Sequence, residues 1–209
     1  MANHTITAPA PYLEEKGILS WILSTDHKRI GIMYLTSVTT FFILAGIAAL
    51  LIRLELISPG KDIVDPHTYN VLFTFHGSAM VFFFIVPGVS ATMGNFLLPL
   101  MIGAPDVAFP KLNLGSYWLY LAGTIVILIG LSQPADTGWT YYTPYSIQSG
   151  TNVIAILSGI FLVGFSSILT GLNFIVTVHK LRAPGMTWHR IPLFVWAVYA
   201  TAYLQLLAT

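Results

Sequence analysis

One histidine lies inside a long apolar stretch, where a titratable side chain is rare. His76 stands within Val71–Ile85, a run whose other residues are apolar, small or hydroxyl-bearing. Since lipid supplies neither water nor counter-ions, such a ring needs a partner on a neighbouring helix, or an ion or cofactor to bind. Neutral imidazole is a common ligand of metals, including haem iron. His76 is therefore a candidate ligand, although a hydrogen bond between helices would explain it equally well at this stage.

A second candidate is a stripe of polar side chains at helical spacing. Ser166, Thr170, Asn173 and Thr177 fall at i, i+4, i+7 and i+11, which is one face of a helix, and Ser167 borders it. In lipid such a face must contact protein or water. The stripe indicates either ordinary hydrogen bonds between helices or the wall of a water-filled path.

Two further residues could extend such a path. Asn95 stands near the end of the same apolar stretch as His76, and Asp106 lies in the proline-containing segment Gly103–Pro110. A carboxylate at the mouth of a polar path could collect protons, although most aspartates in loops are simply solvated.

Charged and aromatic residues mark the ends of other apolar stretches. Arg53 and Glu55 end the first one, where an arginine usually snorkels to the interface but could also pair with an anionic or carbonyl group of a buried cofactor. Trp139 and Tyr142 are typical of an interfacial aromatic belt. Their N–H and O–H groups could instead donate to a cofactor carboxylate.

The composition places these residues in a membrane protein. Charged residues make up 8% of the chain and hydrophobic residues 56%, whereas soluble domains carry about 25% charged residues. The mean hydropathy is +0.77. A net charge of +1 gives no support to a nucleic-acid partner, and the absence of cysteine excludes disulfides, thiolate metal sites and cysteine nucleophiles.

The hydropathy pattern predicts an all-α, polytopic membrane helical bundle with five transmembrane helices. A spanning helix needs about 20 apolar residues, and five stretches qualify: residues 32–52, 69–102, 112–131, 152–178 and 191–208. A polar N-terminal segment, residues 1–31, precedes the transmembrane domain of residues 32–209. Pro87 and Gly88 predict a kink in the second helix. Because an apolar run reaches Thr209, we expect a truncated chain.

Positive residues predict the orientation of the bundle. Seven of the nine Lys and Arg residues fall on one side (Lys16, Lys28, Arg29, Lys111, Lys180, Arg182 and Arg190) and two on the other (Arg53 and Lys61). Since positive residues stay on the cytoplasmic or matrix side, the N-terminus is expected to lie inside. Asp106 would then be at the inner surface and His76 about 10 Å below the outer one, at ~1.5 Å per residue.

Taken together, these segments resemble the N-terminal part of subunit I of the haem–copper oxidases of the cytochrome c oxidase type. The resemblance runs from about residue 19 to the end and is carried by Ser24–Gly31, Ile52–Glu55, Pro59–Gly60, Phe75–Gly77, Gly94–Asn95, Pro99, Gly103–Pro110, Asn113, Gly138–Trp139, Ser166–Leu169, Asn173, Arg182–Met186 and Pro192–Trp196. Phe161 departs from the pattern, because relatives can carry a histidine five residues before the Ser-Ser pair.

The resemblance implies roles for the matched residues. His76 would be one of two axial ligands of a low-spin haem a, with Arg53 on the formyl side and Trp139 and Tyr142 near the propionates. A D-type proton channel would be built from Asp106 at its entrance, Asn95 and Asn113 at its neck with Asn173 close by, and Ser166 and Ser167 further in. A peripheral Ca²⁺ or Na⁺ site would involve Glu55 and Gly60.

The resemblance also implies the whole enzyme, a proton-pumping terminal oxidase that reduces O₂ to water with electrons from cytochrome c. The copper ligands, the high-spin haem ligand and the second ligand of the low-spin haem would lie outside this chain, which alone would be inactive. Its partners would be the remainder of subunit I, subunits II and III and the lipid bilayer, in a bacterial or mitochondrial inner membrane. The alternatives are a quinol oxidase of the same family and, in another class, a five-helix transporter or channel.

Overall fold

The computed structural model describes residues 17–208 except residues 58, 61 and 62, so most of the predicted N-terminal segment lies outside the described residues. Within the described part the chain is helical and has no strand. Four helices are long and apolar enough to cross a membrane: α2 (His27–Glu55), a long helix over Pro66–Ile102, α5 (Pro110–Gly130) and α7 (Val153–Lys180). The chain is therefore an integral membrane protein with the predicted all-α bundle fold.

The fifth apolar helix, α8 (Leu193–Ala208), has 16 residues and begins later than predicted. It is shorter than the ~20 residues of a typical span. Three short elements lie outside the bundle: α1 (Ile18–Ile22), α6 (Tyr145–Gln148) and the 3₁₀ turn η3 (Trp188–Arg190).

Local sequence signals explain where the long helices begin. The Asp26 carboxylate accepts the backbone N–H of Lys28 and caps α2, so this helix starts before the predicted residue 32. At the other surface Asp65 caps the next helix, with Pro66 in its first turn. Hydrogen bonds from the Thr68 hydroxyl and backbone lower the pKa of Asp65, as expected for a capping carboxylate.

The long helix is not uniform where the sequence predicts a kink. It consists of α3 (Pro66–Ser78), the π-helical η1 (Ala79–Ile85), a short α turn, the π-helical η2 (Gly88–Met93) and α4 (Gly94–Ile102). Pro87 lies between the two π segments and has no backbone N–H to donate to the preceding turn. The wider π turns on either side of Pro87 accommodate the hydrogen bond that is missing there. Segments of π-helix inside α-helices often lie at functional sites.

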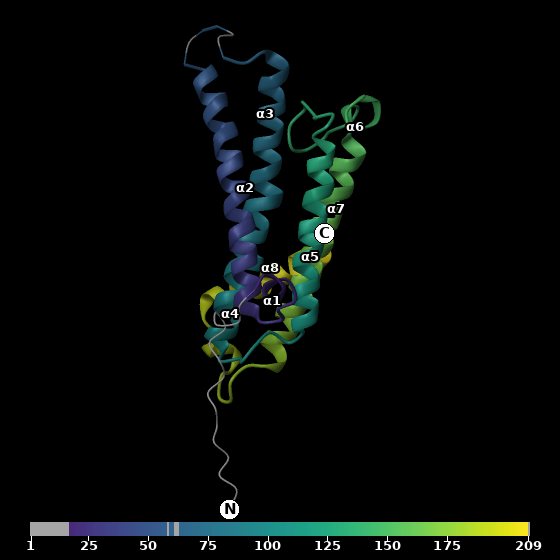
Figure 1. Cartoon of the computed structure of the whole chain (residues 1–209). Coiled ribbons are helices and arrows are strands. Elements are labelled where there is room, and N and C mark those ends of the chain that lie inside the picture. Colours follow the sequence, from purple (N-terminus) through teal and green to yellow (C-terminus); the bar gives the residue numbers. More distant parts are fainter. Residues whose placement is uncertain (1–16, 58, 61–62, 209) are drawn as a thin grey trace, which may run out of the picture.

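Two sets of helices make up the bundle. α5 and α7 share the most extensive contact, and a Cβ added at Gly123 would lie only 2.7 Å from the Gly159 carbonyl oxygen. Small residues of this kind let transmembrane backbones touch. α2 packs along the long helix instead. In Figure 1 the two sets lie close together at the end that carries α4 and separate toward the other end.

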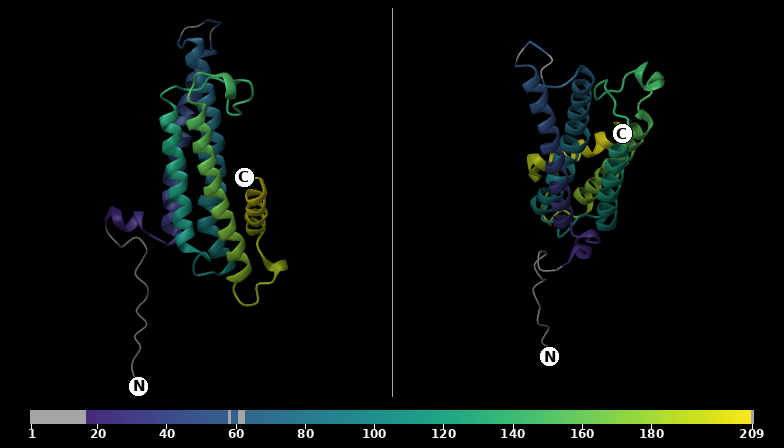
Figure 2. Two further views of the ribbon diagram at one scale, coloured as in Figure 1. Left: turned by 90° about the vertical axis from the view of Figure 1, so that its right-hand side faces the viewer. Right: turned by 45° about the horizontal axis from the view of Figure 1, so that its top comes forward.

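The end with α4 is called the inner end below, after the predicted orientation. Figure 2 shows α8 beside the inner half of α7, and α8 also packs against α4. Apolar residues of α4, α7 and α8 form a buried cluster around Leu98, Phe174 and Val195. A second cluster around Tyr34, Phe83 and Tyr120 joins α2, η1 and α5.

We predict that Gly159→Ala destabilises the bundle, because its Cβ would press on Ile127 and lie 2.6 Å from the Gly123 carbonyl oxygen. Overpacking of this kind costs about 1–3 kcal/mol. Thermal unfolding of the purified protein in detergent should show a lower midpoint. The matched control is Gly115→Ala on α5, where an added Cβ meets nothing within 4 Å. Equal midpoints for the two variants would contradict the close approach of α5 and α7.

Candidate functional site

His76 is held by a hydrogen bond that fixes its tautomer. Its Nδ1 lies 3.0 Å from the backbone carbonyl oxygen of Ala45 on α2. A carbonyl can only accept, so Nδ1 carries a proton, and in the neutral imidazole the lone pair is then on Nε2. Metal-bound histidines commonly donate their other ring N–H to a backbone carbonyl in this way. The half-buried ring of His76 therefore fits the role of a ligand that binds through Nε2.

The loop between α5 and α7 docks on the helix turn that contains His76. Trp139 lies against Gly77, since a Cβ added there would be 3.2 Å from the indole Cδ1. The backbone N–H of Gly138 donates to Thr74 Oγ1 at 2.8 Å. The structure thus places Trp139 against the residue that follows His76.

The same loop contains a tyrosine that sequence reasoning missed. The buried Tyr141 shares a 2.7 Å hydrogen bond with Ser78 Oγ, and burial raises the pKa of its hydroxyl. The predicted Tyr142 is instead 77% exposed. The backbone at Tyr141 has a left-handed φ of 47°, so the alternation of an extended chain does not apply, and no local pattern predicted which of the two tyrosines faces inward.

Arg53 and Glu55 have different surroundings at the outer end of α2. Arg53 is exposed. Glu55 is buried, and its Oε2 accepts the backbone N–H groups of Ile63 at 2.9 Å and Val64 at 3.0 Å. The carboxylate therefore ties the segment before α3 to the end of α2.

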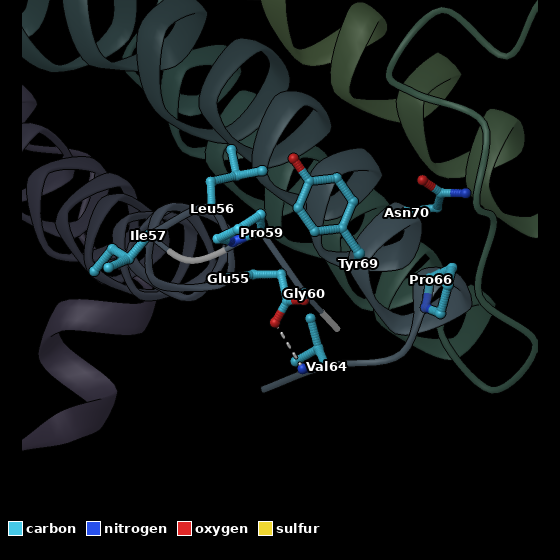
Figure 3. Close-up of a pocket in the computed structure, with 9 residues that line it drawn as sticks. All are labelled: Glu55, Leu56, Ile57, Pro59, Gly60, Val64, Pro66, Tyr69 and Asn70. Carbon is cyan, nitrogen blue, oxygen red and sulfur yellow. Dashed lines mark hydrogen bonds between the residues drawn. The ribbon is translucent and has the colours of Figure 1, made fainter. Parts of the chain in front are cut away.

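Glu55 and Gly60 line one pocket of about 680 Å³ (Figure 3), together with Tyr69 and Asn70. The described residues contain no group of three or more His, Cys, Asp or Glu side chains placed to hold a metal ion. A cation here would depend on backbone and amide oxygens beside Glu55, which are donors that Ca²⁺ accepts.

Asp106 lies at the inner end and contacts a histidine from α2. Its Oδ1 is 3.0 Å from His27 Nδ1 and accepts the backbone N–H of Val107 at 2.6 Å. The Asp106 side chain is 35% exposed, whereas that of His27 is 3% exposed. The Nε2 atom of His27 is buried and has no hydrogen-bond partner among the residues that the structure describes. Sequence patterns could not predict this pair, because its members are 79 residues apart.

The two asparagines predicted at a channel neck are in contact. Asn113 Nδ2 donates to Asn95 Oδ1 at 2.6 Å, and both side chains are fully buried. Asn173, also fully buried, instead holds the segment after Asp106: it accepts the Phe109 N–H at 2.8 Å and donates to the Phe109 carbonyl at 3.2 Å. Asn173 thus holds in place the inner loop, which is the segment of residues 103–109 between α4 and α5.

Hydroxyl groups continue the polar interior beyond the asparagines. Ser116 Oγ donates to the Asn113 carbonyl at 2.7 Å, and Ser166 Oγ donates to the Ser116 carbonyl at 2.6 Å. The buried hydroxyl of Tyr34 bridges Ser116 Oγ at 3.2 Å and Ser166 Oγ at 3.1 Å. Ser167 is half-buried and contacts the carbonyl of Val163 on its own helix at 3.3 Å, so it stands outside this network.

Two atoms in this interior lack partners. Asn113 Oδ1 and Thr92 Oγ1 are buried and accept or donate no hydrogen bond within the described part of the chain. An unsatisfied buried polar atom costs about 1–3 kcal/mol, and internal water is the usual solution. Asn113 Oδ1 and Thr92 Oγ1 are therefore candidate positions for internal water.

Comparisons with known proteins agree on one family. A family model described as "Cytochrome C and Quinol oxidase polypeptide I" matches residues 29–209. The chain is 44% identical over 197 residues to a probable cytochrome c oxidase subunit 1-alpha of Streptomyces avermitilis, with 91% of this chain and 34% of the relative covered. It is 43% identical over 188 residues to cytochrome c oxidase subunit 1 of Thermostichus vulcanus, with 89% and 34% covered.

A third relative is a probable cytochrome c oxidase subunit 1-beta of Nocardia farcinica, 43% identical over 214 residues, with 97% of this chain and 36% of the relative covered. The chain therefore spans about a third of the length of these curated relatives.

We predict ordered water within hydrogen-bonding distance of Asn113 Oδ1 and Thr92 Oγ1, since neither atom has a protein partner in the described residues. A high-resolution cryo-electron microscopy map of the assembled protein should show density beside both atoms. The Asn113→Leu variant should lose the density at its own position. A dry interior in a map that shows waters elsewhere would contradict the hydrated path.

Proposed function

Because this chain belongs to the cytochrome c and quinol oxidase polypeptide I family, we propose that it forms part of the catalytic subunit of a proton-pumping terminal oxidase. In this proposal the complete enzyme reduces O₂ to water with electrons from cytochrome c. This chain supplies one axial haem ligand and the entrance of a D-type proton channel. The printed names of its relatives support cytochrome c as the electron donor, although the family also includes quinol oxidases.

The hydrogen bond between His76 and Ala45 carries the haem proposal. It leaves Nε2 of a half-buried imidazole free to ligate, at a position where lipid disfavours an unpartnered ring. When bound, a low-spin haem a would supply one-electron transfer. Trp139 packs beside this ligand turn and is proposed, with Tyr142, to face the propionates, and Arg53 to contact the formyl side.

The proton path is proposed to begin at Asp106. Its partly exposed carboxylate can exchange protons with the inner aqueous phase, and His27 lies within hydrogen-bonding distance to hold it in place. Asn95 and Asn113 do not titrate, so they act by holding water at the neck. Ser116, Tyr34 and Ser166 then provide hydroxyls that can pass a proton along hydrogen bonds. Asn173 positions the inner loop, and Ser167 would need water to join the path.

The remaining parts of the oxidase would come from elsewhere. The second ligand of the low-spin haem, the high-spin haem and copper are proposed to belong to the remainder of subunit I, of which residues 32–209 form the N-terminal transmembrane part. Subunits II and III would be further partners in a bacterial inner membrane. A Ca²⁺ or Na⁺ ion is proposed at Glu55 and Gly60. Membership of the oxidase family supports this function over the transporter alternative.

We predict that His76→Ala in the complete oxidase removes the low-spin haem band from the reduced-minus-oxidised spectrum, because the axial nitrogen is lost. The control is His67→Ala, which changes an exposed histidine in the first turn of α3 and should leave the spectrum intact. Subunit assembly is checked on a native gel. An unchanged low-spin band in an assembled His76→Ala enzyme would show that the haem-ligand assignment is wrong.

We predict that Asp106→Asn slows proton uptake from the inner side by about a hundredfold or more, the contribution expected of a positioned proton-transfer group. Proton release and O₂ consumption are measured in vesicles that contain the complete enzyme. Asp136→Asn, which alters a carboxylate in the outer loop between α5 and α7, should retain normal uptake. Normal pumping and turnover in Asp106→Asn would defeat the proposed path.

A further inference from the structure

The segment that links α7 to α8 concentrates positive charge at the inner end. Residues 179–190 contain no Asp or Glu, and their basic or titratable cationic side chains are His179, Lys180, Arg182, His189 and Arg190. None of the ion pairs formed by described residues involves this segment. The charge is therefore not neutralised within the described protein.

Aromatic rings from three elements surround the centre of this charge. The Arg182 guanidinium lies 4.0 Å from the centre of the Trp188 ring. Trp188 in turn packs on His179 at 5.1 Å and on Tyr199 and Trp196 at 5.5 Å between ring centres. We call His179, Arg182, Trp188, Trp196 and Tyr199 the inner aromatic corner. Its residues come from the end of α7, the link, η3 and the first turns of α8.

Hydrogen bonds make the inner aromatic corner a preformed structure. His179 Nε2 lies 2.7 Å from the Tyr199 hydroxyl, which lies 3.1 Å from the hydroxyl of Tyr203 one turn further along α8. The backbone N–H of Ala183 donates to the Ile102 carbonyl at 2.9 Å. This last bond fixes the link beside the end of α4, so the position of Arg182 is set before any ligand binds.

The Arg182 guanidinium has a buried N–H donor without an acceptor among the described residues. Its Nη1 is buried and bonds to no atom of the described residues. Trp188 occupies one face of the guanidinium, whereas the N–H donors lie in its plane, and Nη1 is the donor left without an acceptor among the described residues. Arginine forks match phosphate and carboxylate oxygens in this geometry. An anion would satisfy the buried donor.

The surroundings decide which anion fits. Trp196 and Tyr203 are 39% and 42% exposed, and Leu193 is 85% exposed, so the corner continues into an apolar surface of α8. Aromatic residues of this kind sit at the level of lipid headgroups, and basic pockets on the inner side of membrane proteins bind anionic headgroups. A ligand here needs an anionic group joined to an apolar tail.

We propose that the inner aromatic corner binds an anionic phospholipid of the inner leaflet. The lipid phosphate pairs with Arg182, and the neighbouring cations favour a headgroup of net negative charge. The acyl chains lie along Leu193, Trp196 and Tyr203 on α8. This site is separate from His76 and from the path that begins at Asp106, and it does not depend on either proposal.

The test uses the complete oxidase in lipid nanodiscs doped with a photoactivatable phosphatidylglycerol, and adducts are mapped by mass spectrometry. We expect adducts on residues 181–208. Arg182→Gln should reduce them by about tenfold, the effect of losing a charge-assisted hydrogen bond. The matched control is Lys111→Gln, which removes an exposed inner cation from the first turn of α5 and should leave the yield unchanged.

Two further comparisons identify the ligand. A photoactivatable phosphatidylcholine should label the corner more weakly, and excess inorganic phosphate should not displace the phosphatidylglycerol. If Arg182→Gln does not assemble, Trp188→Leu keeps the charge, releases the guanidinium from its ring and should also lower the yield.

Four outcomes would overturn the proposal: equal labelling in the assembled variant, equal labelling by both lipids, displacement by free phosphate, or protection of the corner by an acidic segment of another subunit.

Discussion

The absence of water in the membrane interior is the constraint on which this structure depends. Helices satisfy their own backbone groups there, but each polar side chain must find a partner inside the bundle. Asn95, Asn113, Ser116, Ser166 and Asn173 are all buried, and they meet at the contacts between helices while apolar side chains face outward. Hydrogen bonds join Asn95 to Asn113, Asn113 to Ser116, and Tyr34 to both serines, so these groups form one connected region. Asn173 bonds instead to the backbone of Phe109.

The same constraint separates two kinds of chemistry along the bundle. His76 occupies the outer half, where a backbone carbonyl holds one ring nitrogen and a docked loop covers the following turn. The asparagines and hydroxyls occupy the inner half, between Asp106 and Tyr34. The two π-helical segments lie between His76 and Asn95 on one continuous helix. Their wider turns change the helical phase, so these two residues can face different neighbours.

Residue types and spacing predicted the features that depend on one helix at a time. Hydropathy predicted the long helices. The position of His76 inside an apolar stretch marked it as a candidate ligand, and the i, i+4, i+7 spacing indicated the polar stripe on α7. Contacts between helices could not be predicted in this way. His27 and Asp106 are 79 residues apart, and Tyr34 and Ser166 are 132 residues apart, so neither pair forms a local sequence pattern. The predicted role of Asn173 is similarly incomplete, since its bonds to Phe109 depend on how the inner loop folds.

The contact of Gly123 with Gly159 also has a mechanical consequence. Two backbones that touch cannot slide past one another without a clash, so α5 and α7 should move as one stiff body. Relative motion of the helices would then occur mainly at the boundary between the α5–α7 pair and the other helices. The bonds from Asn113 to Asn95 and from Tyr34 to Ser116 and Ser166 cross that boundary. The polar interior thus lies at the boundary between the two sets of helices, where small rotations of one set against the other would break or form these hydrogen bonds.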